Sequence, residues 1–271
     1  MIQERIYFDE SDDRVWLDTY AVNDPVNSLR DAVLVIPGGA YCHFCLREGQ
    51  YTAFALLGRG VNAFVLRYSI GKDAVYPRQL LDAARALKYI KENAEKYHID
   101  ENRIFAFGYS AGGHLLGTLA TKHAFAEEEL GLPRDYLKIR GAVFCYPVIT
   151  AYGATHQGSF ENLMKKPLSE YTEEEKENLS IERCITKDTP PAFIWHTSED
   201  KVVPINGTLR LCRAYAEAGQ TVEMHIYPYG AHGTALGTEY TSNGKADHIQ
   251  PRVVVWFEEA LKWMKDLDNA R

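Results

Sequence analysis

The sequence predicts an α/β fold in which a mostly parallel sheet carries helices on both faces. Short apolar runs alternate along the 271 residues with longer segments of helical periodicity. The runs are rich in β-branched residues and show little polar alternation, which is typical of strands buried on both faces. Strands that alternate with helices join into parallel sheets through right-handed crossovers. We therefore expect one such sheet.

The first elements follow in order from the N-terminal side. Residues 14–22 alternate imperfectly between polar and apolar side chains, which predicts a strand. The run at 32–36 predicts a second strand that ends at a Pro-Gly-Gly turn, and the run at 63–68 predicts a third. Pro77 then begins a helix, at a position where its missing N–H is no loss. The apolar face of that helix is formed by Leu80, Leu81, Ala84, Leu87 and Ile90.

The second half of the chain repeats the alternation. Strands are expected at 104–107, 141–148, 192–197 and 222–227, and helices at 110–121, 205–218 and 252–267. Residues 150–188 interrupt the pattern, because they carry no strand signal and contain a charged stretch. A connection of this length is usually functional or holds helices of its own. We predict a single domain over 1–271, with 150–188 as an insertion over the carboxyl edge of the sheet, where ligands bind in open α/β folds.

Composition and charge exclude several classes of protein. Hydrophobic residues make up 46% and charged residues 25%, as in ordinary globular proteins. The net charge is −7 and no Lys/Arg cluster is present, so no nucleic-acid partner is expected. No apolar run approaches the roughly 20 residues that a membrane helix needs. Residues 1–13 lack the basic and apolar regions of a signal peptide, so we expect a cytoplasmic protein without a membrane partner.

The most specific motif is Gly108-Tyr109-Ser110-Ala111-Gly112, a G-x-S-x-G sequence between an expected strand and an expected helix. The chain must reverse within a few residues there, so the serine occupies a tight turn with its hydroxyl held above the sheet. At a helix N-terminus the dipole and the free N–H groups favour negative charge. Ser110 is therefore the predicted nucleophile.

A serine nucleophile needs a base and an acid that orients the base. In this context they follow the serine in the order Asp or Glu, then His. Asp200 and His232 each lie in a loop directly after an expected strand, in that order. Glu199, next to Asp200, is the alternative acid. His114, one helical turn after Ser110, is interpreted as a packing residue rather than the base.

An oxyanion hole completes the predicted site. One donor is the N–H of Ala111, the residue after the nucleophile, and others are expected from the Gly-rich loop at 36–41. Each such donor is worth on the order of 3 kcal/mol of transition-state stabilisation. Tyr41 and Tyr109, which are adjacent to these parts in sequence, are predicted to contact the substrate.

Five cysteines are too few and too scattered for a disulfide scaffold. Cys42 and Cys45 form a C-x-x-C pair, but a zinc site would need two further ligands at suitable spacing, and the sequence offers no second cluster. We interpret them as structural cysteines that line the pocket, and we expect no metal.

Together these motifs resemble those of the acetyl-xylan-esterase-like group of α/β hydrolases. The matching segments are 37–41, 47–49, 65–69, 108–115, 156–159, 196–204 and 230–233. The resemblance implies an α/β-hydrolase fold, no cofactor, and removal of acetyl groups from oligosaccharides such as xylan fragments. It also implies Ser110 as nucleophile, His232 as base and Asp200 as its orienting acid, with Gly39, Ala40 and Ala111 as oxyanion donors. Relatives often carry a third glycine where this chain has Ala40.

The motifs and the resemblance predict a serine esterase for short acyl esters, with a small-molecule ester as its partner. Three alternatives stay open: a general short-chain carboxylesterase, an amide hydrolase such as a peptidase or arylformamidase, and a non-catalytic binding protein on a hydrolase fold. The sequence leaves the oligomeric state open, with a homodimer as one alternative.

Overall fold

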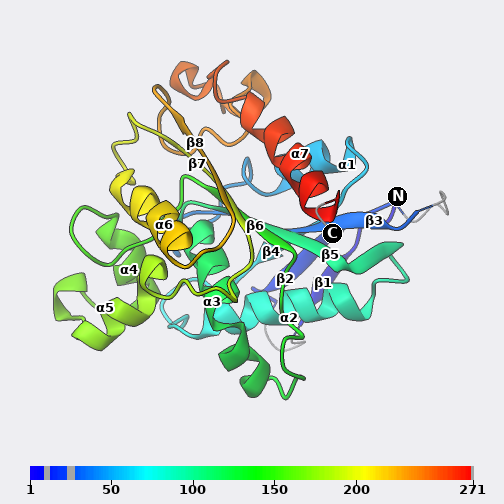
Figure 1. The fold of residues 1–271 in the computed structure, drawn as a ribbon, viewed down its shortest axis with the longest axis horizontal. Helices are drawn as coiled ribbons and strands as arrows, with labels where there is room; N and C mark the ends of the chain where they lie inside the picture. Colours follow the sequence, from blue (N-terminus) through cyan, green and yellow to red (C-terminus); the bar gives the residue numbers. More distant parts are fainter. Residues whose placement is uncertain (9–12, 23–27, 270–271) are drawn as a thin grey trace.

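The computed structural model describes residues 1–8, 13–22 and 28–269, and within them eight strands form one sheet (Figure 1). Its strands are β1 (Arg5–Tyr7), β2 (Trp16–Tyr20), β3 (Arg30–Ile36), β4 (Asn62–Arg67), β5 (Ile99–Tyr109), β6 (Gly141–Cys145), β7 (Ala192–Thr197) and β8 (Val222–Tyr227). Their order in the sheet is β1-β2-β4-β3-β5-β6-β7-β8. Only β2 pairs antiparallel, with β1 and β4, and the other neighbours are parallel. The predicted fold class is confirmed.

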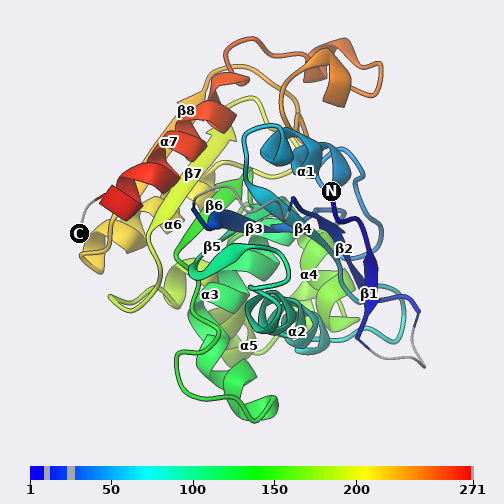
Figure 2. The ribbon, with the colours of Figure 1, turned by 90° about the vertical axis from the view of Figure 1, so that its right-hand side faces the viewer.

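Helices cover both faces of this sheet (Figure 2). The helices are α1 (Gln50–Leu57), α2 (Arg78–Glu92), α3 (Ala111–Glu129), α4 (Gln157–Met164), α5 (Glu173–Leu179), α6 (Asn206–Glu217) and α7 (Val255–Asn269). Short 3₁₀ turns lie at Leu168–Glu170, Ile181–Arg183, Glu239–Thr241 and Ala246–His248. One face packs on α1 and α7, and the other packs on α2, α3 and α6. None of the described helices is both long and apolar enough to cross a membrane.

The central strands are apolar on both faces because each face joins a different core. In β3, Ala32, Leu34 and Ile36 belong to the core beneath α2 and α3. Val33 and Val35 point the other way, into the core beneath α1 and α7. Successive side chains of a strand alternate between faces, so a strand with helices on both sides must be apolar throughout.

Outside the insertion, one strand and one helix were not predicted, β1 and α1. β1 has three residues, too few to show a period. The sequence of α1, QYTAFALL, is apolar on nearly all sides, so it has no polar face that would reveal a helix. β5 also begins five residues before its predicted start. Its first five residues, 99–103, are mostly polar, so they gave no apolar signal for a strand.

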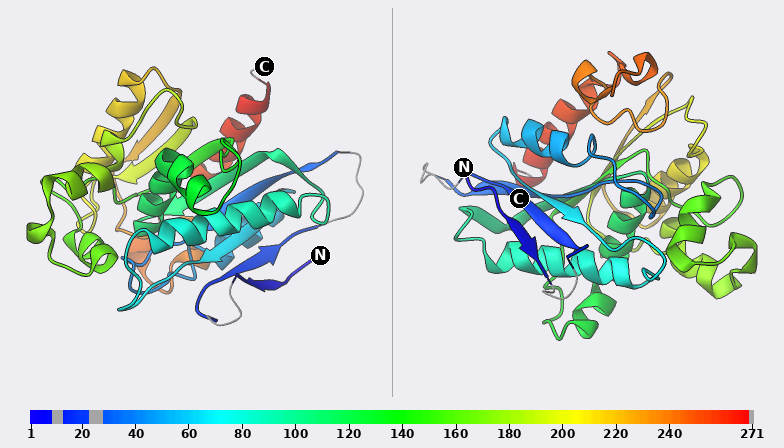
Figure 3. Two further views of the ribbon diagram at one scale, coloured as in Figure 1. Left: turned by 90° about the horizontal axis from the view of Figure 1, so that it is seen from below. Right: turned by 180° about the vertical axis from the view of Figure 1, so that it is seen from behind.

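Residues 150–188 contain α4, α5 and two of the 3₁₀ turns, in place of strands. They contact α3 and α6 and lie beside α6 in the views of Figures 1 and 3. Asn162 of α4 donates a side-chain hydrogen bond of 2.9 Å to the carbonyl of Ala40. The insertion therefore reaches the Gly-rich loop that follows β3. The assignment of the whole chain to one domain stays a prediction.

Candidate active site

Ser110 occupies a sharp turn between β5 and α3, with a positive φ of 51°. A positive φ is strained for a residue with a Cβ and is typical of functional sites. The two glycines of the motif are required by close packing. A Cβ at Gly108 would lie 2.7 Å from the carbonyl oxygen of Gly112, and one at Gly112 would lie 2.1 Å from that of Ile36. The motif thus brings α3 directly against the end of β3.

Three loops at the carboxyl edge of the sheet bring Ser110, His232 and Asp200 together. The Nε2 atom of His232 lies 2.8 Å from the Oγ atom of Ser110. The Nδ1 atom of His232 lies 2.6 Å from the Oδ2 atom of Asp200. With the proton on Nδ1 donated to the carboxylate, Nε2 is free to accept the hydroxyl proton of Ser110. This geometry is that of a nucleophile, a base and an orienting acid.

Asp200 is held as an ionised carboxylate. Its Oδ1 atom accepts the backbone N–H groups of Val202 and Val203, both at 2.9 Å. Burial by itself raises the pKa of Asp200, but hydrogen bonds from His196 and His232 outweigh it and hold the pKa well below its ordinary value. The alternative acid, Glu199, is exposed and faces the N–H of Gly230 at 3.5 Å, so the structure places Asp200 and not Glu199 against His232.

His196 is a second histidine on the same carboxylate, and the sequence reasoning missed it. It is fully buried in β7, with Nε2 at 3.2 Å from Oδ2 of Asp200 and 3.0 Å from the carbonyl of Val203. Its Nδ1 atom lies 2.7 Å from the hydroxyl of Thr208. The spacing of four residues between His196 and Asp200 was the available signal, but only the turn after β7 brings the two side chains together.

The Gly-rich loop and the start of α3 provide the backbone N–H groups of the predicted oxyanion hole. The N–H of Gly38 is already bonded to Oε2 of Glu48 at 2.8 Å. Within the described residues, the N–H groups of Gly39, Ala40 and Ala111 have no acceptor. Gly39 and Ala40 line a cavity of about 180 Å³ together with Ser110 and His232. The amides of Gly39 and Ala40 thus border the cavity that holds Ser110, and the assignment of all three N–H groups to an oxyanion hole stays a prediction.

Tyr41 and Tyr109 do not line this cavity, which corrects the prediction that they contact the substrate. Tyr41 is 1% exposed, and its hydroxyl lies 2.8 Å from Nδ1 of His114. Tyr109 is 0% exposed and bonds the hydroxyl of Thr52 at 2.9 Å on the opposite face of the sheet. The Tyr41 side chain belongs to one core and the Tyr109 side chain to the other.

His114 packs as expected, since both of its ring nitrogens bond to groups other than Ser110 and His232. Its Nε2 atom lies 2.7 Å from the carbonyl of Leu179, so it joins the Tyr41 loop, α3 and the insertion. Burial lowers the pKa of His114 to about 4, which keeps the ring neutral at pH 7. The insertion also supplies His156, which lines the cavity opposite His232 and Gly39.

Arg47 and Glu48 join the Gly-rich loop to the loop that carries His232. Glu48 is buried, and besides the N–H of Gly38 it accepts the hydroxyl of Tyr146 at 2.9 Å. Arg47 donates from Nη1 to the carbonyl of Gly233 at 2.8 Å and to Nδ1 of His248 at 2.6 Å. The sequence reasoning used these residues only as part of the resemblance.

The cysteines are free thiols. Cys45 lines the cavity, where burial raises the pKa of its thiol to about 11 and keeps it protonated. Cys42 is exposed and does not line it. Among the residues that the structure describes, no group of three or more His, Cys, Asp or Glu side chains is arranged to hold a metal ion.

Comparison with known proteins places this chain among esterases. Residues 17–214 match the model of the BD-FAE family. The chain is 36% identical over 235 residues to endo-1,4-beta-xylanase B of Butyrivibrio fibrisolvens. The aligned region makes up 84% of this chain and 36% of that protein. It is 27% identical over 256 residues to the acetylxylan esterase of Xylanibacter ruminicola. That aligned region makes up 90% of this chain and 46% of that protein.

A solved structure covers the whole length of the chain. The acetyl ester-xyloside bifunctional hydrolase from Caldicellulosiruptor lactoaceticus matches with a TM-score of 0.80 and 28% identity, over 98% of this chain and 96% of that one. The two curated relatives are longer proteins, since the chain spans less than half of each. The family match confirms the resemblance that the motifs indicated.

Proposed function

This chain belongs to the BD-FAE family of α/β hydrolases, and we propose that it is a serine esterase that removes short acyl groups, acetyl in particular, from acetylated oligosaccharides such as xylan fragments. The observation that carries the chemistry is the contact of His232 with both Ser110 and Asp200. The carbohydrate substrate is proposed from the printed activities of two relatives, an acetylxylan esterase and an acetyl ester-xyloside hydrolase.

In the proposed mechanism, Nε2 of His232 takes the hydroxyl proton of Ser110 as the serine oxygen attacks the acyl carbonyl. The negative charge that develops on the carbonyl oxygen is accepted by N–H groups of Ala111 and of the loop at Gly39 and Ala40. His232 then protonates the leaving sugar hydroxyl. Water hydrolyses the acyl-enzyme by the same route in reverse, while Asp200 remains ionised and stabilises the imidazolium.

A preference for short acyl groups is proposed from the size of the cavity. Its volume of about 180 Å³ is below the range of about 300–1,000 Å³ that drug-sized ligands occupy. Its lining includes His156 of the insertion and four residues of the loop after β3, which are Gly39, Ala40, His43 and Cys45. An acetyl group needs little of this space, whereas a long acyl chain would have to displace part of this lining.

The test is hydrolysis of a nitrophenyl-ester series from acetate to octanoate, together with acetate release from acetylated xylo-oligosaccharides. We expect fast turnover of acetate, a steep fall with chain length, and release from the oligosaccharide. Ser110→Ala is expected to abolish turnover, and Ser198→Ala, an exposed serine near Asp200, is the matched control. Wild-type rates in the Ser110→Ala variant would refute the serine mechanism. Ester turnover without oligosaccharide release would refute the carbohydrate substrate.

A further inference from the structure

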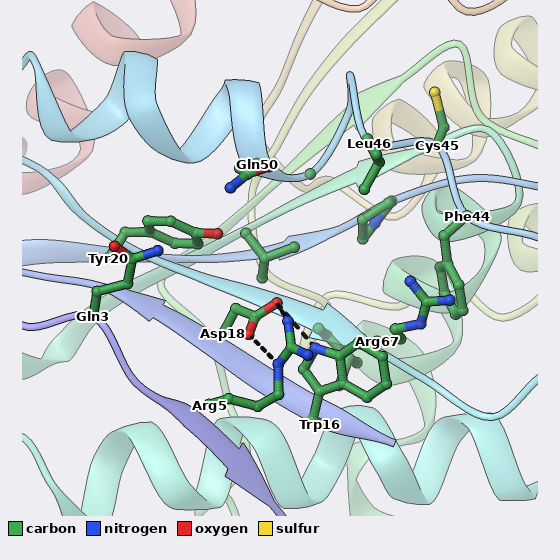
Figure 4. A pocket seen from close by; sticks show the side chains of 14 residues that line it. Gln3, Arg5, Trp16, Asp18, Tyr20, Phe44, Cys45, Leu46, Gln50 and Arg67 are labelled. Atoms are coloured by element: carbon green, nitrogen blue, oxygen red, sulfur yellow. Dashed lines mark hydrogen bonds and ion pairs between the residues drawn. The ribbon is translucent and has the colours of Figure 1, made fainter. Parts of the chain in front are cut away.

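A second cavity lies apart from the candidate active site, on the sheet face that α1 covers (Figure 4). Its volume is about 190 Å³, and it is formed by β1, β2, β4 and the segment 37–50. It shares only Cys45 with the active-site cavity. The loop between β3 and α1 therefore has the candidate active site on one side and this cavity on the other.

Arg67, the last residue of β4, has an unused guanidinium in this cavity. Its Cζ atom lies 4.6 Å from the ring centroid of Trp16 and 4.4 Å from that of Phe44. These two rings hold the guanidinium in place, but neither accepts a conventional hydrogen bond. The side chain makes no hydrogen bond to any other residue that the structure describes. Its planar fork of N–H donors is the group that binds carboxylates in a bidentate manner.

The other charges of the cavity are already paired. Arg5 donates to both carboxylate oxygens of Asp18, at 2.7 and 3.2 Å. Asp18 also accepts the indole N–H of Trp16 at 2.9 Å. Among the residues that the structure describes, Arg67 is therefore the one charged side chain of the cavity lining without an ion pair. Burial, and then the nearby Arg5, lower the pKa of Arg67, and the smaller opposite effect of Asp18 does not cancel them.

Neutral polar groups lie at the other end of the cavity. Figure 4 shows Tyr20, Gln3 and Gln50 grouped on the side away from Phe44 and Arg67. Amide and phenol groups are suited to sugar hydroxyls, since each donates and accepts. The volume of about 190 Å³ is below that of most drug-sized sites and suits one monosaccharide unit. Arg5 and Arg67 both lie over the Trp16 ring, so recognition is by the guanidinium rather than by stacking on the indole.

We propose that this cavity binds a carboxylate-bearing sugar, a hexuronate, with its carboxylate on Arg67 and its hydroxyls toward Gln3 and Gln50. The cavity adjoins the loop that borders Ser110. Such a site would select oligosaccharides that carry an acidic branch close to the acylated position. That link to the substrate rests on the proposed function, whereas the binding of the hexuronate does not.

The test is calorimetric titration of the full chain, as the Ser110→Ala variant, with sodium glucuronate. Glucuronamide is the matched ligand, since it replaces the carboxylate by a neutral amide of the same shape. We expect glucuronate to bind at least about tenfold more tightly than glucuronamide. Arg67→Gln should weaken glucuronate by a similar factor, and Arg67→Lys should weaken it less. Arg59→Gln, at an arginine outside the cavity that pairs with Glu258, should leave it unchanged.

Equal affinity for glucuronate and glucuronamide would overturn the proposal, as would glucuronate binding that is unaffected by Arg67→Gln. Equally tight binding of acetate or inorganic phosphate would also overturn it, since the site would then be a general anion site. The comparison of the two ligands needs no cavity variant, so poor folding of Arg67→Gln does not block it. The titration measures binding to an inactive serine variant. A negative binding result therefore does not bear on the proposed esterase activity, and a negative esterase assay does not bear on hexuronate binding.

Discussion

At the scale of single residues, the candidate site depends on one carboxylate with two histidines. Asp200 contacts His232, which reaches Ser110, and also His196, which reaches Thr208 and the carbonyl of Val203. Two backbone N–H groups complete its hydrogen bonds. The contacts of Asp200 with His196 and with the two backbone N–H groups orient the carboxylate independently of His232. The carboxylate in turn orients the ring of His232.

Replacing Asp200 by Asn tests which acid orients His232. The amide cannot stabilise the imidazolium and favours the wrong tautomer, so we expect kcat to fall by roughly 10³–10⁴-fold with the fold intact. Glu199→Gln is the matched control in the neighbouring residue and should retain activity near that of wild type. The measurement is steady-state hydrolysis of nitrophenyl acetate. A large loss in Glu199→Gln and a small one in Asp200→Asn would reverse the assignment.

His114 should make stability depend on pH in the mildly acidic range. Its pKa is lowered to about 4 in the folded chain, against about 6.5 when unfolded. Between these values the unfolded chain binds the proton and the folded chain does not, so stability falls as the pH drops through this window. The full effect is on the order of 3 kcal/mol. We expect His114→Gln to show a smaller loss of unfolding free energy between pH 7 and pH 4, measured by urea denaturation. An equal loss in both proteins would contradict this.

At the scale of elements, the site is assembled by two connections between the β3–α1 loop and the loop after β8. Glu48 joins the N–H of Gly38 to the hydroxyl of Tyr146, which in turn accepts the N–H of Ala235 at 3.1 Å. Arg47 binds the carbonyl of Gly233, next to His232. Two adjacent residues, Arg47 and Glu48, thus connect the loop of the proposed oxyanion donors to the loop of the proposed base.

Glu48→Gln should lower kcat by about 10- to 100-fold with little change in KM. Gln offers one acceptor oxygen where the carboxylate has two, so either the Gly38 N–H or the Tyr146 hydroxyl loses its partner and the loop shifts. Glu174→Gln, at an exposed glutamate of α5, is the control. Labelling of Ser110 by a covalent serine probe and the melting temperature would show that the variant is folded. Unchanged kcat in the folded variant would exclude this positioning role.

Gly112 lies against the end of β3, and this contact should be costly to disturb. A Cβ there would lie 2.1 Å from the carbonyl oxygen of Ile36 and 2.5 Å from that of Pro37. We expect Gly112→Ala to lower the unfolding free energy by about 3 kcal/mol or more, since backbone must move. Gly158→Ala in α4 meets its nearest atom at 3.5 Å and should be neutral or slightly stabilising. The unfolding free energies of both variants are measured by chemical denaturation. Similar losses of unfolding free energy in the two variants would refute the packing argument.

At the scale of the whole molecule, one sheet separates two cores, and two cavities lie at different edges of that sheet. The candidate active site lies where β5, β7 and β8 end, and the Arg67 cavity lies on β1, β2 and β4. The loop between β3 and α1 borders both. The antiparallel strands at one edge of the sheet thus contribute to a second concave surface, besides the one at the carboxyl edge.

Burial rather than covalent cross-linking holds this architecture, because all five cysteines are free thiols. A chain of this length buries enough surface to fold without disulfides. We therefore expect the melting temperature to be the same with and without excess reductant. Paired thermal scans measure this, and a lower melting temperature under reducing conditions would indicate a disulfide.

The sequence by itself determined the mostly parallel sheet, most of the strands and helices along the chain, and the three residues that meet at the carboxyl edge of the sheet. Alternating apolar runs and helical segments permit few topologies other than a parallel sheet. Once that sheet is given, residues that directly follow strands must gather at one edge. This is why Ser110 and His232, which are 122 residues apart in the sequence, were predicted to meet and lie within hydrogen-bonding distance. Asp200 follows the same rule.

Only the tertiary structure decided which neighbours of those residues take part. Tyr41 and Tyr109 turn into the cores, and Arg47 bonds to His248, 201 residues away. Arg67 lies between two rings and has no acceptor among the described residues. No local pattern encodes these outcomes. Burial and long-range pairing depend on how distant elements pack, and short elements such as β1 and α1 are fixed by that packing and not by their own periodicity.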